Sequence, residues 1–263
     1  MNDIYSESKT ASTFNMLLEY RWHTGYPQMF YGQVALENDL IKNLNLKPGS
    51  RVLDFGSGNC IVTGDYCLMK PDCTFYAVNR TVDDLKWGQN TNSKRGIHNI
   101  QYKVADGETH LPFISNFFDA IIFTESVCHV RNKDNLFREF YRILKPGGRL
   151  TGSDWHMNNN TRFLKKINQA YGTDILPSYQ ELLQKNGFKN FKSTSFYPIN
   201  NFKFSELCSY PFMALKYSWL NRNLPSIDPS GSTINPDLIT SGNLIERAAK
   251  QHKFWVAVST AIK

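Results

Sequence analysis

The chain has 263 residues, of which 41% are apolar and 20% charged, so it can bury a core and is not a disordered chain. Thirty basic against 23 acidic residues give a net charge of +7, which allows an anionic partner without selecting one. Five scattered cysteines without a C-x-x-C pair argue against a disulfide framework and a zinc site.

Strands and helices are predicted to alternate through the first two thirds of the chain. The predicted strands are 52–55, 74–78, 99–104, 118–123 and 149–153. The predicted helices are 33–46, a segment ending near 69, a stretch through 86 and 87, and 135–144, with residues 145–148 closing the last one. This alternation favours an α/β fold with a doubly wound, mostly parallel sheet.

The last third is predicted to complete that sheet around an insertion. A helix is expected over 178–186, a strand over 188–197 and a final strand over 253–262. Residues 198–250 hold five prolines and no clear period, which is typical of a lid. The expected organisation is therefore an arm and helix over 1–46, a core over 47–197, the lid over 198–250 and a last core strand within 251–263.

The strongest chemical signal is a glycine turn that follows an apolar strand. Val52-Leu53-Asp54-Phe55 runs into Gly56-Ser57-Gly58, and a helix follows. Such a turn presents free backbone N–H groups to a ligand. The third glycine of a dinucleotide motif is replaced by Ile61, and Asp54 would repel phosphate but suit an ammonium group. The alternative is a strand-to-helix turn without chemical meaning.

Three spaced segments resemble the class I S-adenosylmethionine-dependent methyltransferases over about residues 47–153. They are Leu46–Gly58, the stretch from Ala105-Asp106-Gly107 to Phe118-Asp119, and Phe140–Leu150. The resemblance implies a seven-stranded Rossmann-like fold, S-adenosyl-L-methionine as cofactor and S-adenosyl-L-homocysteine as product. It also implies that Asp54, Gly56 and Gly58 face the methionine part. Cys60 departs from the family's third glycine.

Further cofactor contacts are implied at the ends of the next strands. Asp106, followed by Gly107, would accept a hydrogen bond from the adenine amino group; the alternative is a turn-forming aspartate. Asn79 and Arg80 stand where most members carry a ribose-binding acid, and Asn79 could bind a hydroxyl without charge. An asparagine there resembles the branch of sterol, prenyl and tocopherol C-methyltransferases. Thr124 is expected to complete the cofactor site.

The segment Thr124-Glu125-Ser126-Val127-Cys128-His129 also resembles sterol methyltransferases. On a helical turn Glu125 and His129, four residues apart, would share one face. Methylation of an alkene produces a carbocation and needs a base to take a proton, so either residue is a candidate catalytic base. The alternative is that Glu125 caps a helix and that His129 packs against it.

Aromatic residues mark a candidate pocket for a hydrophobic substrate. The segment from Phe196 to Trp219 is rich in aromatic rings, and the arm adds further rings. The predicted substrate residues are Tyr31, Trp155, Phe204, Tyr210 and Tyr217. The alternative is that these rings form the core of the lid. No metal site is expected beside Trp155 and His156, since further ligands at suitable spacing are not evident.

The favoured function is C-methylation of an isoprenoid or other natural-product intermediate. The alternatives are O- or N-methylation, or cofactor-assisted cyclisation or scaffolding without methyl transfer. Nucleic acid is not expected as a partner, because residues 124–126 lack the motif for exocyclic amines. With neither a secretory signal nor a membrane span in view, a cytoplasmic location is expected. The sequence leaves the oligomeric state open, a homodimer included.

Overall fold

The structure is a computed structural model that describes residues 34–158, 163–196, 247–248 and 251–263. Within these ranges one seven-stranded sheet has the order β3-β2-β1-β4-β5-β7-β6. The strands are β1 (Arg51–Phe55), β2 (Thr74–Asn79), β3 (Ile100–Val104), β4 (Phe118–Thr124), β5 (Leu144–Met157), β6 (Lys189–Phe196) and β7 (Phe254–Ile262). The helices are α2 (Val34–Leu44), α3 (Ile61–Met69), α4 (Val82–Lys94), the 3-10 helix η1 (Val127–His129), α5 (Lys133–Ile143), α6 (Leu164–Tyr171) and α7 (Gln180–Lys185).

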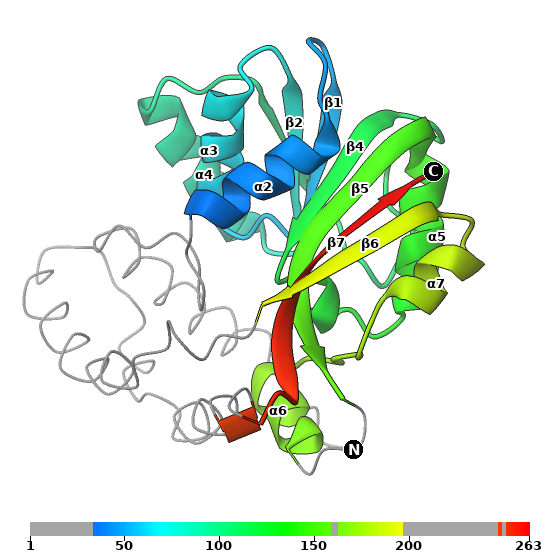
Figure 1. The fold of residues 1–263 in the computed structure, drawn as a ribbon. Coiled ribbons are helices and arrows are strands. Elements are labelled where there is room, and N and C mark those ends of the chain that lie inside the picture. Colours follow the sequence, from blue (N-terminus) through cyan, green and yellow to red (C-terminus); the bar gives the residue numbers. More distant parts are fainter. Residues whose placement is uncertain (1–33, 159–162, 197–246, 249–250) are drawn as a thin grey trace, which may run out of the picture.

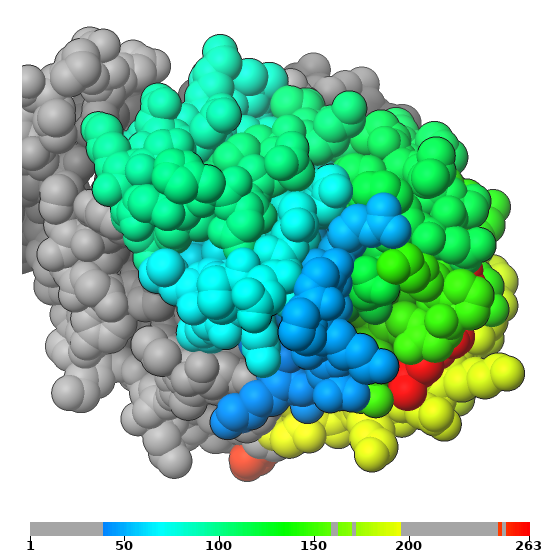
Figure 2. Space-filling model, turned by 90° about the horizontal axis from the view of Figure 1, so that it is seen from above, coloured from blue at the N-terminus to red at the C-terminus, as the bar shows by residue number. Residues whose placement is uncertain are grey.

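The sheet is parallel except at β7, which confirms the predicted doubly wound fold. Strand β1 pairs in parallel with β2 and β4, β3 pairs with β2, and β5 pairs with β4. Strand β7 runs antiparallel between β5 and β6. In Figure 2 the red atoms of this C-terminal segment lie between the green and yellow atoms of its neighbours. Because β1 and β4 are central and apolar, their carboxyl ends are held at one well-defined edge.

Helices cover both faces of the sheet (Figure 1). On one face α2, α3 and α4 pack through residues such as Leu40, Tyr66 and Leu85 against strand residues that include Phe75. On the other face α5 and α7 pack against the strands. The apolar side of α5 consists of Leu136, Phe137, Phe140 and Ile143, at the spacing of one helix face.

Two predicted element boundaries were wrong. The strand expected over 149–153 runs from Leu144 to Met157, and residues 145–148 do not end the preceding helix as a turn. Gly147 has φ +75°, its N–H donates to the carbonyl of Lys263, and the ladder is irregular here, so the segment is a bulge paired with the C-terminus. Helix α5 begins at Lys133 rather than 135, because the side chain of Asn132 accepts a hydrogen bond from the N–H of Asn135.

Candidate functional site

The turn after β1 is built from residues with left-handed backbone. Gly56, Gly58 and Cys60 have φ of +70°, +52° and +60°. The N–H groups of Gly56 and Ser57 both donate to the carbonyl of Val78, at 2.8 and 3.0 Å, which fixes the turn to β2. Cys60 stands in the left-handed region where the related motif has its third glycine, so the turn keeps its path at some conformational cost.

The glycine at position 56 is required by a second turn that lies against it. A Cβ atom on Gly56 would lie 2.3 Å from the Cβ of Ser126, which follows β4. The Ser126 hydroxyl donates to the carbonyl of Phe55 at 2.9 Å. The glycine turn and the 124–129 segment, predicted separately from sequence, are therefore in direct contact.

Asp54 is a buried carboxylate at the carboxyl end of β1. Its side chain accepts a hydrogen bond from the Thr63 hydroxyl at 2.5 Å, and the residue is 4% exposed. Burial raises the pKa of Asp54 to about 6, although the bond from Thr63 opposes that rise. A ligand with a positive group here would stabilise the ionised form, so the site fits the ammonium-bearing cofactor expected from sequence.

At the end of β2, Asn79 connects the glycine turn to helix α4. Its Nδ2 atom donates to the carbonyl of Gly58 at 3.3 Å and to Oδ2 of Asp84 at 2.9 Å. Its Oδ1 atom remains as an acceptor for a hydroxyl. The sequence did not lead us to Asp84. Its carboxylate lies at the end of β2 beside Asn79, the position at which most related enzymes carry a ribose-binding acid. The signal was the acidic pair Asp83-Asp84 at the start of a helix. Arg80 is exposed beside this corner.

Asp106 lies in a tight turn after β3. Its Oδ1 atom accepts from the N–H of Glu108 at 3.0 Å, so the alternative reading as a turn-forming aspartate is confirmed. Gly107 is required here, because a Cβ would lie 2.6 Å from the ring of Phe55. The second carboxylate oxygen of Asp106 carries no hydrogen bond to the described residues, and the adenine contact stays a prediction.

The segment after β4 differs from the helical turn expected over residues 125–129. Glu125 has φ +48°, its N–H donates to the carbonyl of Ser153 at 2.8 Å, and the 3-10 helix η1 begins only at Val127. Glu125 and His129 therefore do not share a helix face. A non-glycine residue in the left-handed region costs free energy, and such strain is common at functional sites. The Thr124 hydroxyl is buried and has no partner among the described residues, so it can serve a bound group.

His129 ends η1 and is kept neutral by its surroundings. Burial is the largest cause that lowers its pKa, and the positive charges of Arg80 and Lys133 act in the same direction. The negative charge of Asp154 and a hydrogen bond with the backbone of Gly172 oppose this. A neutral imidazole at pH 7 can accept a proton, as a base must.

The predicted substrate residues are the least supported by geometry. Trp155, on β5, is 2% exposed, and its ring lies 5.7 Å from that of Phe254 in an edge contact within a core cluster. Its role in substrate binding stays a prediction. Tyr31, Phe204, Tyr210 and Tyr217 lie outside the described residues.

Two kinds of feature are absent from the described part of the chain. It holds no group of three or more His, Cys, Asp or Glu side chains suited to a metal ion. It also holds no helix of the length and apolar character needed to cross a membrane.

A comparison with protein families matches residues 53–152 to the family model described as a methyltransferase domain. Phosphoethanolamine N-methyltransferase 1 of Arabidopsis thaliana is 30% identical in an alignment of 181 residues that covers 65% of this chain and 35% of that protein. Sterol 24-C-methyltransferase of Schizosaccharomyces pombe is 27% identical in an alignment of 181 residues that covers 64% of this chain and 47% of that protein. The chain spans about a third to a half of the length of these curated relatives.

A comparison with solved structures supports the fold of the described residues. Phosphoethanolamine N-methyltransferase 2 of Haemonchus contortus, solved in complex with S-adenosyl-L-methionine, superposes with a TM-score of 0.72 and 19% identity. The match covers 95% of this chain and 57% of that one. At this identity the likeness shows a shared fold, and the chemistry has to be argued from the residues.

Proposed function

Because residues 53–152 match the family model of a methyltransferase domain, we propose that this chain transfers a methyl group from S-adenosylmethionine to a small molecule. The observation that carries the proposal is the buried carboxylate of Asp54 directly before the left-handed turn at Gly56 and Gly58. A buried acid with a raised pKa is stabilised by a cationic ligand, and the open backbone of the turn lets that ligand approach.

The chain's own residues supply four kinds of contact to the cofactor. Asp54 would pair with the ammonium group, and Thr124 would donate or accept a hydrogen bond close by. Asn79 and Asp84 would bind the ribose hydroxyls, since their side chains meet 2.9 Å apart at the end of β2. Asp106 would accept from the adenine amino group. When bound, the cofactor supplies a methyl carbon made electrophilic by its positively charged sulfur.

The acceptor class that we propose is a hydrophobic alkene, methylated on carbon. The support is Asn79, which stands where most related enzymes carry an acid, and the Glu125–His129 segment. The alkene carbon forms a bond to the methyl carbon, and the carbon–sulfur bond breaks with its electron pair on sulfur. The resulting carbocation loses a proton to His129 or Glu125, which restores a double bond.

An amine acceptor is the second candidate, and one electrostatic interaction favours it. The positive charge of Arg80 acts on His129, so the candidate base lies within the field of a cation. An acceptor with a phosphate could pair with Arg80 while His129 takes the proton of the amine. The similarity to phosphoethanolamine N-methyltransferases fits the same reading.

Calorimetric titration with S-adenosylmethionine and S-adenosylhomocysteine tests the cofactor. Micromolar binding of both is expected, and Asp84→Asn should weaken it by about tenfold through loss of a charged hydrogen bond. Asp83→Asn, one residue earlier and exposed, is the matched control and should bind as the wild type does. Failure of the wild type to bind either compound would overturn the proposal.

The acceptor is tested with methyl-labelled cofactor and two probes, a prenyl diphosphate and phosphoethanolamine. Mass spectrometry of the products should show label on carbon of the first. Label on nitrogen of the second would instead select the amine. Glu125→Gln and His129→Gln should each be compared with wild type; the residue that acts as base should lose turnover by about 100-fold while cofactor affinity stays.

A further inference from the structure

The turn that bears His129 is fixed on both sides by groups from other elements. The N–H of Cys128 donates to Oδ2 of Asp154 on β5 at 2.9 Å, and the carbonyl of Cys128 accepts from the N–H of Asp174 at 2.7 Å. On the other side, the carbonyl of Val130 accepts from Nζ of Lys133 at 2.5 Å. The peptide groups that flank His129 are thus held from both sides.

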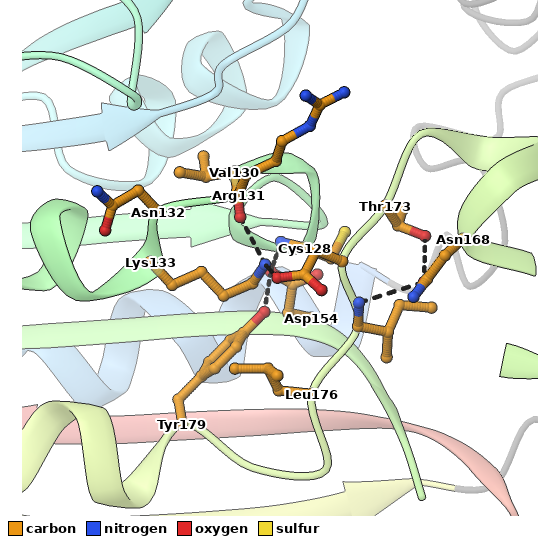
Figure 3. Close-up of polar contacts among 12 residues, drawn as sticks. Cys128, Val130, Arg131, Asn132, Lys133, Asp154, Asn168, Thr173, Leu176 and Tyr179 are labelled. Carbon is orange, nitrogen blue, oxygen red and sulfur yellow. Dashed lines mark hydrogen bonds and ion pairs between the residues drawn. The ribbon is translucent and has the colours of Figure 1, made fainter. Parts of the chain in front are cut away.

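Two of these contacts are made by charged side chains that are largely removed from water, those of Asp154 and Lys133, whereas Asp174 uses its backbone N–H. The Lys133 side chain is 2% exposed and pairs with Asp174 at 3.1 Å, and Asp154 is buried. Oδ2 of Asp154 receives a second hydrogen bond, from the Tyr179 hydroxyl at 3.1 Å (Figure 3). Buried charges are costly unless they are paired or hydrogen-bonded, so the Lys133 ammonium group and the Asp154 carboxylate each depend on the partners that they have here.

Asp174 belongs to a segment that is itself anchored. The Asn168 side chain on α6 accepts from the Thr173 hydroxyl at 2.9 Å and from the N–H of Ile175 at 3.2 Å. The carbonyl of Leu176 lies 2.9 Å from Nδ1 of His156 on β5. The N–H of Asp174 that binds the Cys128 carbonyl therefore belongs to an anchored segment, and this hydrogen bond helps to fix the position of η1.

We propose that Asp154, Lys133 and Asp174 form a clamp that positions His129 as the proton acceptor of the methyl-transfer reaction. The inference rests on the proposed function and makes the three clamp residues positioning residues. His129 keeps a partly exposed side chain, while its neighbours Cys128 and Val130 are buried. The clamp fixes the backbone on both sides of His129 and so holds the imidazole in one place relative to a bound acceptor.

The clamp also carries opposing charges that act on His129. The groups that act on the imidazole are Asp154 from β5, Lys133 from α5, Arg80 after β2 and the backbone of Gly172 after α6. Loss of the Lys133 charge should therefore raise the pKa of His129, and loss of the Asp154 charge should lower it. Replacement of a side chain that contributes only packing would leave the pKa of His129 unchanged.

The experiment compares Lys133→Met with Lys185→Met. Lys185 also forms an ion pair with α5, to Asp134 at 2.8 Å, but it is exposed and away from the turn. The His129 ring signal, identified by its loss in His129→Gln, is titrated by NMR in the cofactor-free protein. Cofactor affinity is measured with S-adenosylmethionine, and turnover with whichever of the two probes is methylated.

For Lys133→Met we expect a higher His129 pKa, turnover lowered by about tenfold and cofactor affinity within about twofold of wild type. Lys185→Met should match the wild type in all three. If Lys133→Met does not fold, Lys133→Gln removes the same charge and keeps a polar side chain, so the same rise in the His129 pKa is expected. An unchanged His129 pKa in the folded variant overturns the clamp, and it does so even if neither probe is methylated. Lack of cofactor binding by the wild type overturns only the proposed function.

Discussion

At the scale of single residues, we expect Asp54 to favour cofactor binding while it lowers the stability of the cofactor-free protein. Burial raises its pKa from 3.8 to about 6, so between these values the native protein holds a proton that the unfolded chain has released. Stability therefore falls as pH rises through this interval. The rise corresponds to roughly 3 kcal/mol against the ionised form at neutral pH.

Asp54→Asn should make the cofactor-free protein more stable, because the amide has no charge to bury. At pH 7 the gain should be about 1–3 kcal/mol, and at pH 4.5 it should be smaller by about 2 kcal/mol. Urea unfolding at the two pH values measures this, with the exposed Asp72→Asn as control. The same variant should lose affinity for S-adenosylmethionine. A variant less stable than wild type at pH 7 would contradict the argument.

At the scale of elements, the sequence predicted what local pattern determines. The apolar strand, the glycine turn and the helix after it are confirmed, as are Asp54 and Gly56 at the turn. Asp106 was placed correctly after β3, since an aspartate before glycine favours a turn through local hydrogen bonding.

What the sequence did not predict depends on partners far along the chain. Strand β5 extends back to Leu144 because its start pairs with residues near Lys263. Glu125 takes a left-handed backbone because its N–H bonds to Ser153 on the next strand. Lys133 and Asp174 are 41 residues apart, and a charged pair at that separation leaves no periodic signal.

Gly88 couples helix α4 to the glycine turn, and this contact yields a test. Replacement of a helix glycine by alanine commonly stabilises by up to about 1 kcal/mol. Here the added Cβ would lie 2.4 Å from the carbonyl oxygen of Asn59. Gly88→Ala should instead destabilise by about 2 kcal/mol and weaken cofactor binding, because α4 must move off the turn.

Ser93→Ala, at an exposed site on the same helix, is the control for Gly88→Ala. It should change stability by less than about 0.5 kcal/mol. Thermal unfolding of both variants, followed by calorimetric titration, measures the two effects. A gain in stability for Gly88→Ala would refute the close packing of α4 on the turn.

At the scale of the whole molecule, the sheet extends beyond the residues that match the methyltransferase family model. The match ends at residue 152, within β5, but all nine residues of β7 pair with Arg149–Met157. Strand β7 also pairs with β6, which has no other strand neighbour in the described sheet. The edge of β5 is therefore closed by residues about 100 positions later, and the site at the ends of β4 and β5 depends on them.

Ala257→Pro tests this dependence at the centre of β7. Ala257 is buried and pairs with Asp154 on one side and Ser195 on the other. Proline lacks the N–H that a central strand donates, so the variant should lose about 3 kcal/mol or more. Ala257→Ser keeps the N–H and should remain folded. Circular dichroism, urea unfolding and S-adenosylmethionine titration should show that Ala257→Pro loses fold and binding together. Wild-type cofactor affinity in a variant without β7 pairing would instead mean that strands β1 to β5 form the site unaided.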